Sequence, residues 1–395
     1  MSATRGDCWA LVRAGSESGA VLYSGVLHAG TSVTVHGRRL WARFGASSNL
    51  DFRLNGKPVQ FHQGGTVDVV VSAAGFAAAL PAAATSVHTG TSVQTATTVH
   101  TGNAAGPLCG SLAGATKPPT IEHVVWIFME NKSEGSILGA HADPFIRTVA
   151  SECGLATNYH NITHPSLPNY LAATSGSTHG VASDCHPTKC MAPGPSIFSQ
   201  LVAANENWRS YVENMPVPCD PNDQGVYAVK HNPALYYAEL TGACDRNDVP
   251  LEGALEHDLA AGRLPAFSMI VPNTCDDMHS CAISKADAWL RAWVGRIAAT
   301  QSYQAGDVVV FITWDEGGHV RHDAFGENCA QHPSDQSCHV ALLVLSEYTR
   351  PGTADPTLYT HYSLLLTTEQ LLGLHDPLGA AADPGTHSLR DPFGL

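Results

Sequence analysis

Four apolar runs of strand length recur in the C-terminal part of the chain, and segments with helical spacing of apolar residues lie between them. The runs cover residues 124–129, 267–271, 308–314 and 340–345. In one intervening segment Trp289, Trp293 and Ile297 fall on the same face of a helix. This alternation predicts an α/β domain whose mostly parallel sheet is covered by helices on both faces.

The N-terminal residues follow a different pattern, in which short runs alternate apolar and polar positions. The runs at 33–35 and 67–71 are examples, and turn signals such as Asn55-Gly56 separate them. An Asn-Gly pair between strand-like runs favours a β-hairpin. Residues 1–75 are therefore predicted to form a small all-β domain.

A stretch of different composition joins the two parts. Residues 76–118 are rich in Ala, Thr, Ser and Gly, and Val-His-Thr-Gly occurs twice. With few large apolar groups such a stretch cannot offset the entropy cost of ordering, so we predict a flexible linker and assign the α/β domain to 119–395. The apolar stretch 69–84 is too short for a transmembrane helix.

Composition and charge narrow the classes of function. Hydrophobic residues make up 44% of the 395, which excludes wholesale disorder. The net charge is −14, divided into +4 over residues 1–118 and −18 over 119–395. A nucleic-acid-binding protein needs Lys and Arg to replace counterions, so this class is disfavoured. The 21 histidines equal Lys and Arg combined, which favours a search for acid/base or metal sites.

Polar side chains follow three of the predicted strands at the point where each strand ends. Glu130-Asn131 follow the first run, 273–279 follow the second, and Asp315-Glu316 follow the third. In parallel sheets, ligands bind at the carboxyl ends of strands, and hard divalent cations prefer carboxylate and amide oxygens. One acidic pair alone more often caps a helix or faces solvent, but the coincidence of three favours a metal site.

A candidate nucleophile lies between these strand ends in the sequence. Ser166 is flanked by Pro165 and Pro168, and a helix is predicted to start near Asn169. A helix N-terminus and a nearby metal both stabilise a serine alkoxide. The alternative is that Ser166 only caps the helix. The carboxylates at the strand ends favour the role of nucleophile instead.

Ten of the eleven cysteines lie from Cys109 onward. Their spacings are not Cys-x-x-Cys, so disulfides are favoured over zinc ribbons. The expected short bridges are Cys185–Cys190, Cys275–Cys281 and Cys329–Cys338, the longer ones are Cys109–Cys153 and Cys219–Cys244, and Cys8 is left over. A bridge between Cys275 and Cys281 would clamp the loop that carries Asp277 and His279.

Five disulfides imply an oxidising compartment. The first seven residues lack the apolar region of a signal peptide. We therefore expect an extracytoplasmic or secreted protein whose signal or anchor precedes this sequence. A cytosolic enzyme with reduced thiols is the alternative.

Residues 119–395 resemble the phosphoesterase family of acid phosphatases and bacterial phospholipases C, a branch of the alkaline-phosphatase-like superfamily. Six motifs carry the resemblance in the same order, at 123–133, 163–171, 227–233, 271–279, 313–317 and 360–365. The shorter acid and lipid phosphatases of mycobacteria are more similar to this chain than the longer phospholipases C are.

The resemblance implies catalytic roles. Ser166 is at the position of the phosphorylated nucleophile, and His231 and His279 match residues that contact the phosphoryl group or protonate the leaving group. Asp277 accompanies His279. Ser280 stands where relatives often have Asp.

The resemblance also implies the metal ligands, namely Glu130, Asn131, Asp315 and Glu316. His361 is a further candidate, because it matches a ligand of two-metal relatives. Other histidines, such as His141, His186 and His332, are interpreted as surface or structural residues.

Residues 1 to about 75 resemble the C-terminal β domain of RodZ-type membrane proteins. The resemblance rests on Cys8-Trp9 and on residues 23–27, 40–45 and 54–59. It implies binding or scaffolding.

We therefore predict a metal-dependent phosphomonoesterase that forms a phosphoserine, with Ca or Mg favoured and Fe or Zn also considered. Its substrates are phosphate monoesters, including phosphoinositides or other phospholipids met in transient membrane contact. One alternative is a phospholipase C-type phosphodiesterase whose choline cage would use Trp208, Tyr211, Tyr236 and Tyr237. Another is a cell-envelope binding module with a vestigial enzyme.

Overall fold

The computed structural model describes residues 1–6, 8–15, 21–44, 47–59, 67–72, 75–78, 107–139, 143–240, 244–318, 328–332 and 334–395. The chain divides into two compact units, Met1–Val99 and His100–Leu395. Most of the predicted linker and His141 lie outside the described residues. The described residues 107–118 fall within the predicted linker, but they belong to the second unit and pack against the rest of it. There Leu112 N donates to Glu347 O over 2.8 Å, and Cys109 is bridged to Cys153.

The described strands of the N-terminal unit pair antiparallel in two small sheets. Their orders are β3-β2-β4-β7-β8 and β1-β5-β6. Asn55 and Gly56, with φ of 51° and 80°, form the tight turn between β5 and β6, as the Asn-Gly pair predicts. The all-β prediction for this part is confirmed. The strands are β1 (Ser2–Ala3), β2 (Cys8–Ala14), β3 (Val21–Leu27), β4 (Arg39–Phe44), β5 (Leu50–Leu54), β6 (Lys57–Val59), β7 (Val67–Ser72) and β8 (Gly75–Ala78).

A nine-stranded sheet forms the centre of the second unit. Its order is β12-β11-β13-β9-β14-β15-β10-β16, and β17 also pairs with β10. Only β15 runs antiparallel to its neighbours among these strands, so the prediction of a mostly parallel sheet is confirmed. The strands are β9 (His123–Met129), β10 (Gly154–His160), β11 (Trp208–Val212), β12 (Asp248–Pro250), β13 (Phe267–Val271), β14 (Val308–Trp314), β15 (His339–Leu345), β16 (Thr353–Asp355) and β17 (Tyr359–Thr360).

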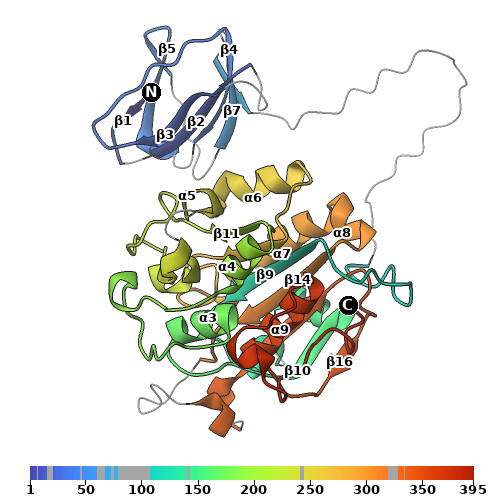
Figure 1. Ribbon diagram of the computed structural model, residues 1–395. Helices are drawn as coiled ribbons and strands as arrows, with labels where there is room; N and C mark the ends of the chain where they lie inside the picture. The colour runs from blue at the N-terminus through green and yellow to red at the C-terminus, as the bar shows by residue number, and fades with distance from the viewer. Residues whose placement is uncertain are drawn as a thin grey trace, which may run out of the picture. The chain divides into compact units, whose positions relative to one another are not determined.

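The central strand β9 shows why the sequence pattern holds. All its residues from 124 to 129 are fully buried, since each side of the sheet is covered. On one side Trp126 Nε1 donates to Thr368 on α9, and Phe128 packs on Tyr170 of α3. Helices α3 and α9 are labelled in Figure 1. Helix α3 packs on α9 and α4, whereas α7 packs on α2 and α8. The helices are α1 (Glu134–Leu138), α2 (Pro144–Glu152), α3 (Ser166–Ser175), α4 (Ile197–Ala203), α5 (Cys244–Asn247), α6 (Leu251–Ala260), α7 (Ile283–Ala298), α8 (Gln301–Ala305) and α9 (His361–Leu371).

Five disulfides cross-link the second unit, and they are the five pairs expected from the sequence. They join Cys109 to Cys153, Cys185 to Cys190, Cys219 to Cys244, Cys275 to Cys281 and Cys329 to Cys338. Cys8 is buried in the N-terminal unit and takes part in none of these bridges. Within the described parts of the chain, no helix has both the length and the apolar character needed to cross a bilayer.

Candidate active site

The carboxyl ends of three adjacent parallel strands meet at one edge of the sheet. Strands β13, β9 and β14 are neighbours, and the polar residues that follow them are bonded to one another. Glu130 N donates to Asp277 O over 2.9 Å, and Asn131 N donates to Asp315 Oδ1 over 3.0 Å. The three polar segments therefore form a single site.

Three acidic side chains are buried together in this site. Glu130 and Asp315 are completely buried, and Glu316 is 4% exposed. Burial, and then the charges of Glu130 and Glu316, raise the pKa of Asp315 well above its usual range. Burial also raises the pKa of Glu316. Asp315 Oδ2 is buried and meets no donor at hydrogen-bonding geometry within the described part of the chain.

This donor set fits a hard divalent cation. A concentration of buried carboxylates is costly unless a positive charge balances it, and the oxygens are those that Mg²⁺ and Ca²⁺ prefer. Asn131 is held in a left-handed conformation with φ of 52°, and its Nδ2 donates to Glu316 Oε1 over 3.3 Å. The side-chain Oδ1 of Asn131 takes no part in that bond and is the oxygen that this residue can offer to a cation. Glu130, Asn131, Asp315 and Glu316 are thus brought together.

Ser166 is the first residue of α3 and lies beside these carboxylates. It is 1% exposed, and its hydroxyl donates to Glu130 Oε2 over 3.3 Å. The alternative of an N-cap is wrong, because Pro165 holds the cap position and makes no side-chain capping bond. Asp184 Oδ1 instead accepts from Leu167 N over 3.0 Å. The Ser166 hydroxyl is left facing the carboxylate cluster.

His231 lies in a short 3-10 helix (Val229–His231) and connects two acidic residues of the site. Its Nε2 is 3.0 Å from Glu130 Oε1, and its Nδ1 is 3.5 Å from Asp277 Oδ2. Burial alone lowers the pKa of His231, but the charges of Glu130 and Asp277 raise it to about 9. Burial on its own would raise the pKa of Glu130, yet the charge of His231, followed by that of Lys230, lowers it to about 2. Both side chains are therefore charged at neutral pH.

His279 stands at the solvent side of the site. Its side chain is exposed, and its ring centroid is 6.3 Å from that of His231. Asp277 Oδ1 accepts from the His279 backbone N–H over 2.7 Å. Ser280, where relatives often have Asp, lies with its hydroxyl 3.0 Å from His279 Nδ1. The bridge between Cys275 and Cys281 closes this loop.

The ring nitrogens of His361 contact protein atoms instead of pointing freely into the site as metal ligands. It is the first residue of α9 and is completely buried. Its Nε2 is 2.7 Å from the Asp315 carbonyl oxygen, and its Nδ1 is 2.8 Å from the Tyr159 hydroxyl. Burial lowers its pKa to about 4. Both ring nitrogens of His361 are thus engaged, and one of them contacts the backbone of Asp315.

Three residues of the site had no role in the sequence analysis. Tyr170 donates to Glu130 Oε1 over 2.7 Å, His164 Nδ1 is 2.7 Å from Glu316 Oε2, and Lys230 Nζ is 2.7 Å from Asp184 Oδ2. All three lie inside motifs at 163–171 and 227–233. Their place inside these motifs is the one sequence feature that points to them. The residues that they contact are distant in sequence, so the contacts themselves could not be predicted.

The prediction that four aromatic residues could form a choline cage is wrong. Trp208, Tyr211, Tyr236 and Tyr237 are all buried in the core. The hydroxyl of Tyr211 donates to Asp258, and that of Tyr236 donates to Cys185 O. These rings therefore do not line an open pocket for a quaternary ammonium group.

Comparisons with known proteins show what this chain is similar to. A model of the phosphoesterase family matches residues 138–375, and a model of the RodZ C-terminal domain matches residues 1–71. A phosphatidylinositol-3-phosphatase of Mycobacterium tuberculosis is 30% identical over 269 residues, covering 68% of this chain and 82% of its own. An acid phosphatase of Aspergillus fumigatus is 30% identical over 244 residues. The match covers 60% of this chain, which spans about half (52%) of that relative's length.

Among solved structures, a protein of the alkaline phosphatase superfamily from Vibrio parahaemolyticus is similar with a TM-score of 0.48 and 11% identity. That match covers 72% of this chain and 73% of the other.

Proposed function

Because the chain belongs to the phosphoesterase family, we propose that it is a metal-dependent phosphomonoesterase that works through a phosphoserine at Ser166. One observation carries the proposal. The buried Ser166 hydroxyl is hydrogen-bonded to Glu130 inside a cluster of acidic side chains, next to the charged His231. A nucleophile, negative metal ligands and a fixed positive group are what phosphoryl transfer needs in one place.

Glu130, Asn131, Asp315 and Glu316 would hold the cation. We propose Ca²⁺ or Mg²⁺, because all four side chains offer oxygen, and none offers the nitrogen or sulfur that favours zinc. A bound divalent cation neutralises phosphoryl oxygens and lowers the pKa of a hydroxyl that contacts it.

The residues of the chain divide the reaction between them. Ser166 Oγ loses its proton to solvent and attacks phosphorus, so that the Oγ–P bond forms and the bond to the leaving oxygen breaks. His279 gives a proton to that oxygen, and the alcohol leaves. Water then attacks the phosphoserine, releasing inorganic phosphate and restoring the Ser166 hydroxyl. His231, charged because Glu130 and Asp277 raise its pKa to about 9, stabilises the phosphoryl oxygens in both steps.

The printed names of the relatives support a proposal for the substrate class. The mycobacterial relative is named a phosphatidylinositol-3-phosphatase and the fungal ones acid phosphatases. We extend monoester hydrolysis, including that of phosphoinositides, to this chain. The carbonyl of Val226, a residue 41% exposed, accepts a hydrogen bond from Thr274 N, so an exposed apolar residue is tied to the loop that carries His279, and we propose it for transient lipid contact.

Substitution of the nucleophile tests the proposal. Ser166→Ala should lower kcat on p-nitrophenyl phosphate at least about a thousandfold while leaving the melting curve intact. Ser183→Ala, on an exposed loop, is the matched control and should keep full activity. Acid quenching during turnover, followed by peptide mass spectrometry, should find phosphate on Ser166. Retained turnover in Ser166→Ala would overturn the proposal, and so would faster hydrolysis of bis(p-nitrophenyl) phosphate than of the monoester, which favours the phosphodiesterase alternative.

We also propose that the enzyme works in an oxidising, extracytoplasmic compartment, since five disulfides cross-link the second unit. Non-reducing peptide mapping of protein from its native source should recover all five bridged peptides. Recovery of these cysteines as thiols would contradict the assignment. Active turnover would separately exclude the alternative of a binding module with a vestigial enzyme.

A further inference from the structure

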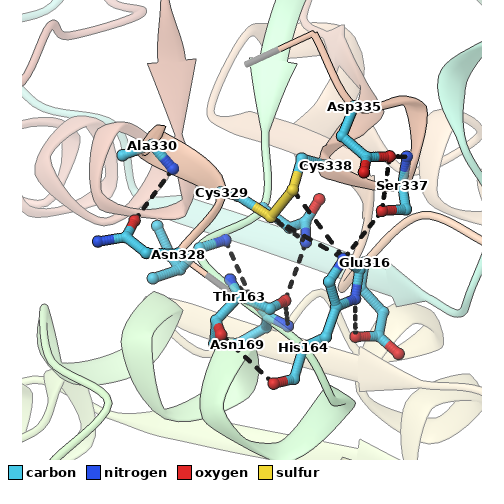
Figure 2. The surroundings of a disulfide bond; sticks show 12 residues. Thr163, His164, Asn169, Glu316, Asn328, Cys329, Ala330, Asp335, Ser337 and Cys338 are labelled. Carbon is cyan, nitrogen blue, oxygen red and sulfur yellow. Dashed lines mark hydrogen bonds and ion pairs between the residues drawn. A yellow bond between two sulfur atoms is a disulfide. The ribbon is translucent and has the colours of Figure 1, made fainter. Parts of the chain in front are cut away.

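Glu316 is held by hydrogen-bonding partners on both of its oxygens. Its Oε2 lies 2.7 Å from His164 Nδ1, and its Oε1 accepts from Asn131 Nδ2 over 3.3 Å. His164 is completely buried and Glu316 nearly so. Figure 2 shows the imidazole of His164 directed at this carboxylate. Glu316 therefore has one defined orientation.

His164 is in turn held from its other side. Its Nε2 is 3.2 Å from Ser337 Oγ, and Ser337 donates its hydroxyl hydrogen to Asp335 Oδ1 over 2.9 Å (Figure 2). Ser337 Oγ therefore bonds to both His164 Nε2 and Asp335. The sulfur atoms of Cys329 and Cys338 lie 3.9 and 4.0 Å from the same nitrogen. The ring is thus fixed in rotation.

The backbone around these side chains is tied together as well. Cys329 N donates to Ile162 O, and Gly317 N donates to Ser337 O, both over 2.9 Å. A Cβ on Gly317 would lie 2.6 Å from Ser337 O, so only glycine allows this approach after Glu316. The strand end after β14, the residues before α3 and the bridged residues 329–332 and 334–338 therefore pack together.

The sequence His164-Pro165-Ser166 invites a different role, namely that the histidine activates the serine two positions later. The structure argues against it. One ring nitrogen faces Glu316 and the other faces Ser337, so neither is left for Ser166 or for a substrate. A general base must reach the proton that it removes.

We infer that His164 is a positioning residue that acts through Glu316. Supported by Ser337 and by the Cys329–Cys338 bridge, it fixes the carboxylate in the orientation that ligates a divalent cation. This inference rests on the proposed function, in which Glu316 is a metal ligand. Partners that orient a metal ligand contribute 10–100-fold to metal affinity in other proteins.

The test is the affinity of the full chain for Mg²⁺, Ca²⁺ and Mn²⁺, measured by isothermal titration calorimetry without substrate. His164→Ala should weaken binding roughly 10–100-fold. His164→Asn, whose amide can occupy the place of Nδ1, should recover most of the loss. Ser337→Ala should weaken binding by a smaller factor. His186→Ala is the matched control and should bind like wild type, because within the described parts of the chain the His186 ring bonds only to Thr188, in its own loop.

Two further measurements separate positioning from a general loss of structure. Melting curves show which variants fold, and saturating metal should restore kcat of His164→Ala to within a few fold of wild type. In a Glu316→Gln background, His164→Ala should cause no additional loss of affinity, since both act on one ligand.

Unchanged affinity in a folded His164→Ala overturns the inference and leaves the proposed function standing. If His164→Ala does not fold, unchanged affinity in Ser337→Ala overturns it instead. Wild-type protein that binds none of the three cations overturns the metal in the proposed function itself, and with it the inference.

Discussion

His231 and Glu130 form an ion pair in the interior of the site, with Nε2 3.0 Å from Oε1 and both side chains buried. The ring of His231 also stacks on that of Tyr170, at 5.4 Å between centroids and 12° between planes. One histidine thus connects Glu130, a proposed metal ligand, with Asp277 on the loop after β13. This connection makes stability depend on pH in a predictable way.

The first prediction concerns that pH dependence in the metal-free enzyme. Although burial opposes it, the charge of Glu130 raises the pKa of His231 from 6.5 to about 9, so the pair stabilises the fold fully below pH 6.5 and stops doing so above pH 9. The pKa of Glu130 is lowered from 4.5 to about 2. On the acidic side, the stabilisation by the pair is therefore lost only as the pH falls below 4.5. The stability advantage of wild type over His231→Gln should fall by roughly 3 kcal/mol between pH 6.5 and 9.

Guanidinium unfolding of chelated protein at several pH values measures this difference. His257→Gln serves as the control, because the His257 side chain is 59% exposed and pairs with Asp258, so its replacement leaves the His231–Glu130 pair in place. A difference between wild type and His231→Gln that stays constant from pH 5 to pH 9 would contradict the assignment of charge to the pair.

The second prediction concerns Tyr170, which donates to Glu130 Oε1 over 2.7 Å. Tyr170→Phe removes a buried hydrogen bond to a charged group, so the free energy of unfolding should fall by about 1–3 kcal/mol. Metal affinity should fall as well, because Glu130 is less well oriented. Tyr303→Phe is the control: its hydroxyl donates over 2.8 Å to Leu108 O, outside the site. It should lose some stability but keep its metal affinity; equal metal affinities in both variants would refute the role of Tyr170.

The third prediction concerns the cost of the acidic cluster. The pKa of Asp315 is raised by burial and by the charges of Glu130 and Glu316, so its ionised form destabilises the metal-free protein above that pKa. Asp315→Asn should therefore raise the melting temperature of chelated protein at pH 8 and abolish the stabilisation by metal. In wild type that stabilisation is about 3 kcal/mol at a metal concentration of 100 times Kd.

Thermal melting with and without Mg²⁺ checks both parts. Asp307→Asn, at the opposite end of β14, is the control and should keep the response of wild type to metal. If metal-free Asp315→Asn melts at a lower temperature than wild type, the carboxylate of Asp315 is not destabilised by the charges of Glu130 and Glu316.

The fourth prediction concerns Val226 at the edge of the His279 loop. Val226→Asp should lower turnover of a phosphatidylinositol phosphate in vesicles about fivefold, because a partly buried valine contributes on the order of 1 kcal/mol at a lipid surface. Hydrolysis of soluble p-nitrophenyl phosphate should not change. Val202→Asp, on α4 and 55% exposed, is the control that should leave both rates unchanged. Equal losses on both substrates would argue against lipid contact.

The sequence determined the parts of this protein that depend on local pattern and on topology. Continuous apolar runs identified β9, β13 and β14, and the parallel arrangement that they imply brings the residues after them to one edge of the sheet. That is why Glu130 and Asp315 were found together in advance. The close cysteine pairs were also predictable, since short loops restrict the possible partners.

The tertiary structure alone decided where ring nitrogens, hydroxyls and aromatic faces point. His164 meets Glu316 across 152 positions of sequence, and His361 meets the backbone of Asp315 across 46. Spacing within a motif says nothing about such partners. The four aromatic residues of the supposed cage were apolar enough to be either core or pocket, and packing buried them. The orientation of a side chain is set by everything that packs around it, and those neighbours come from segments that only the fold brings together.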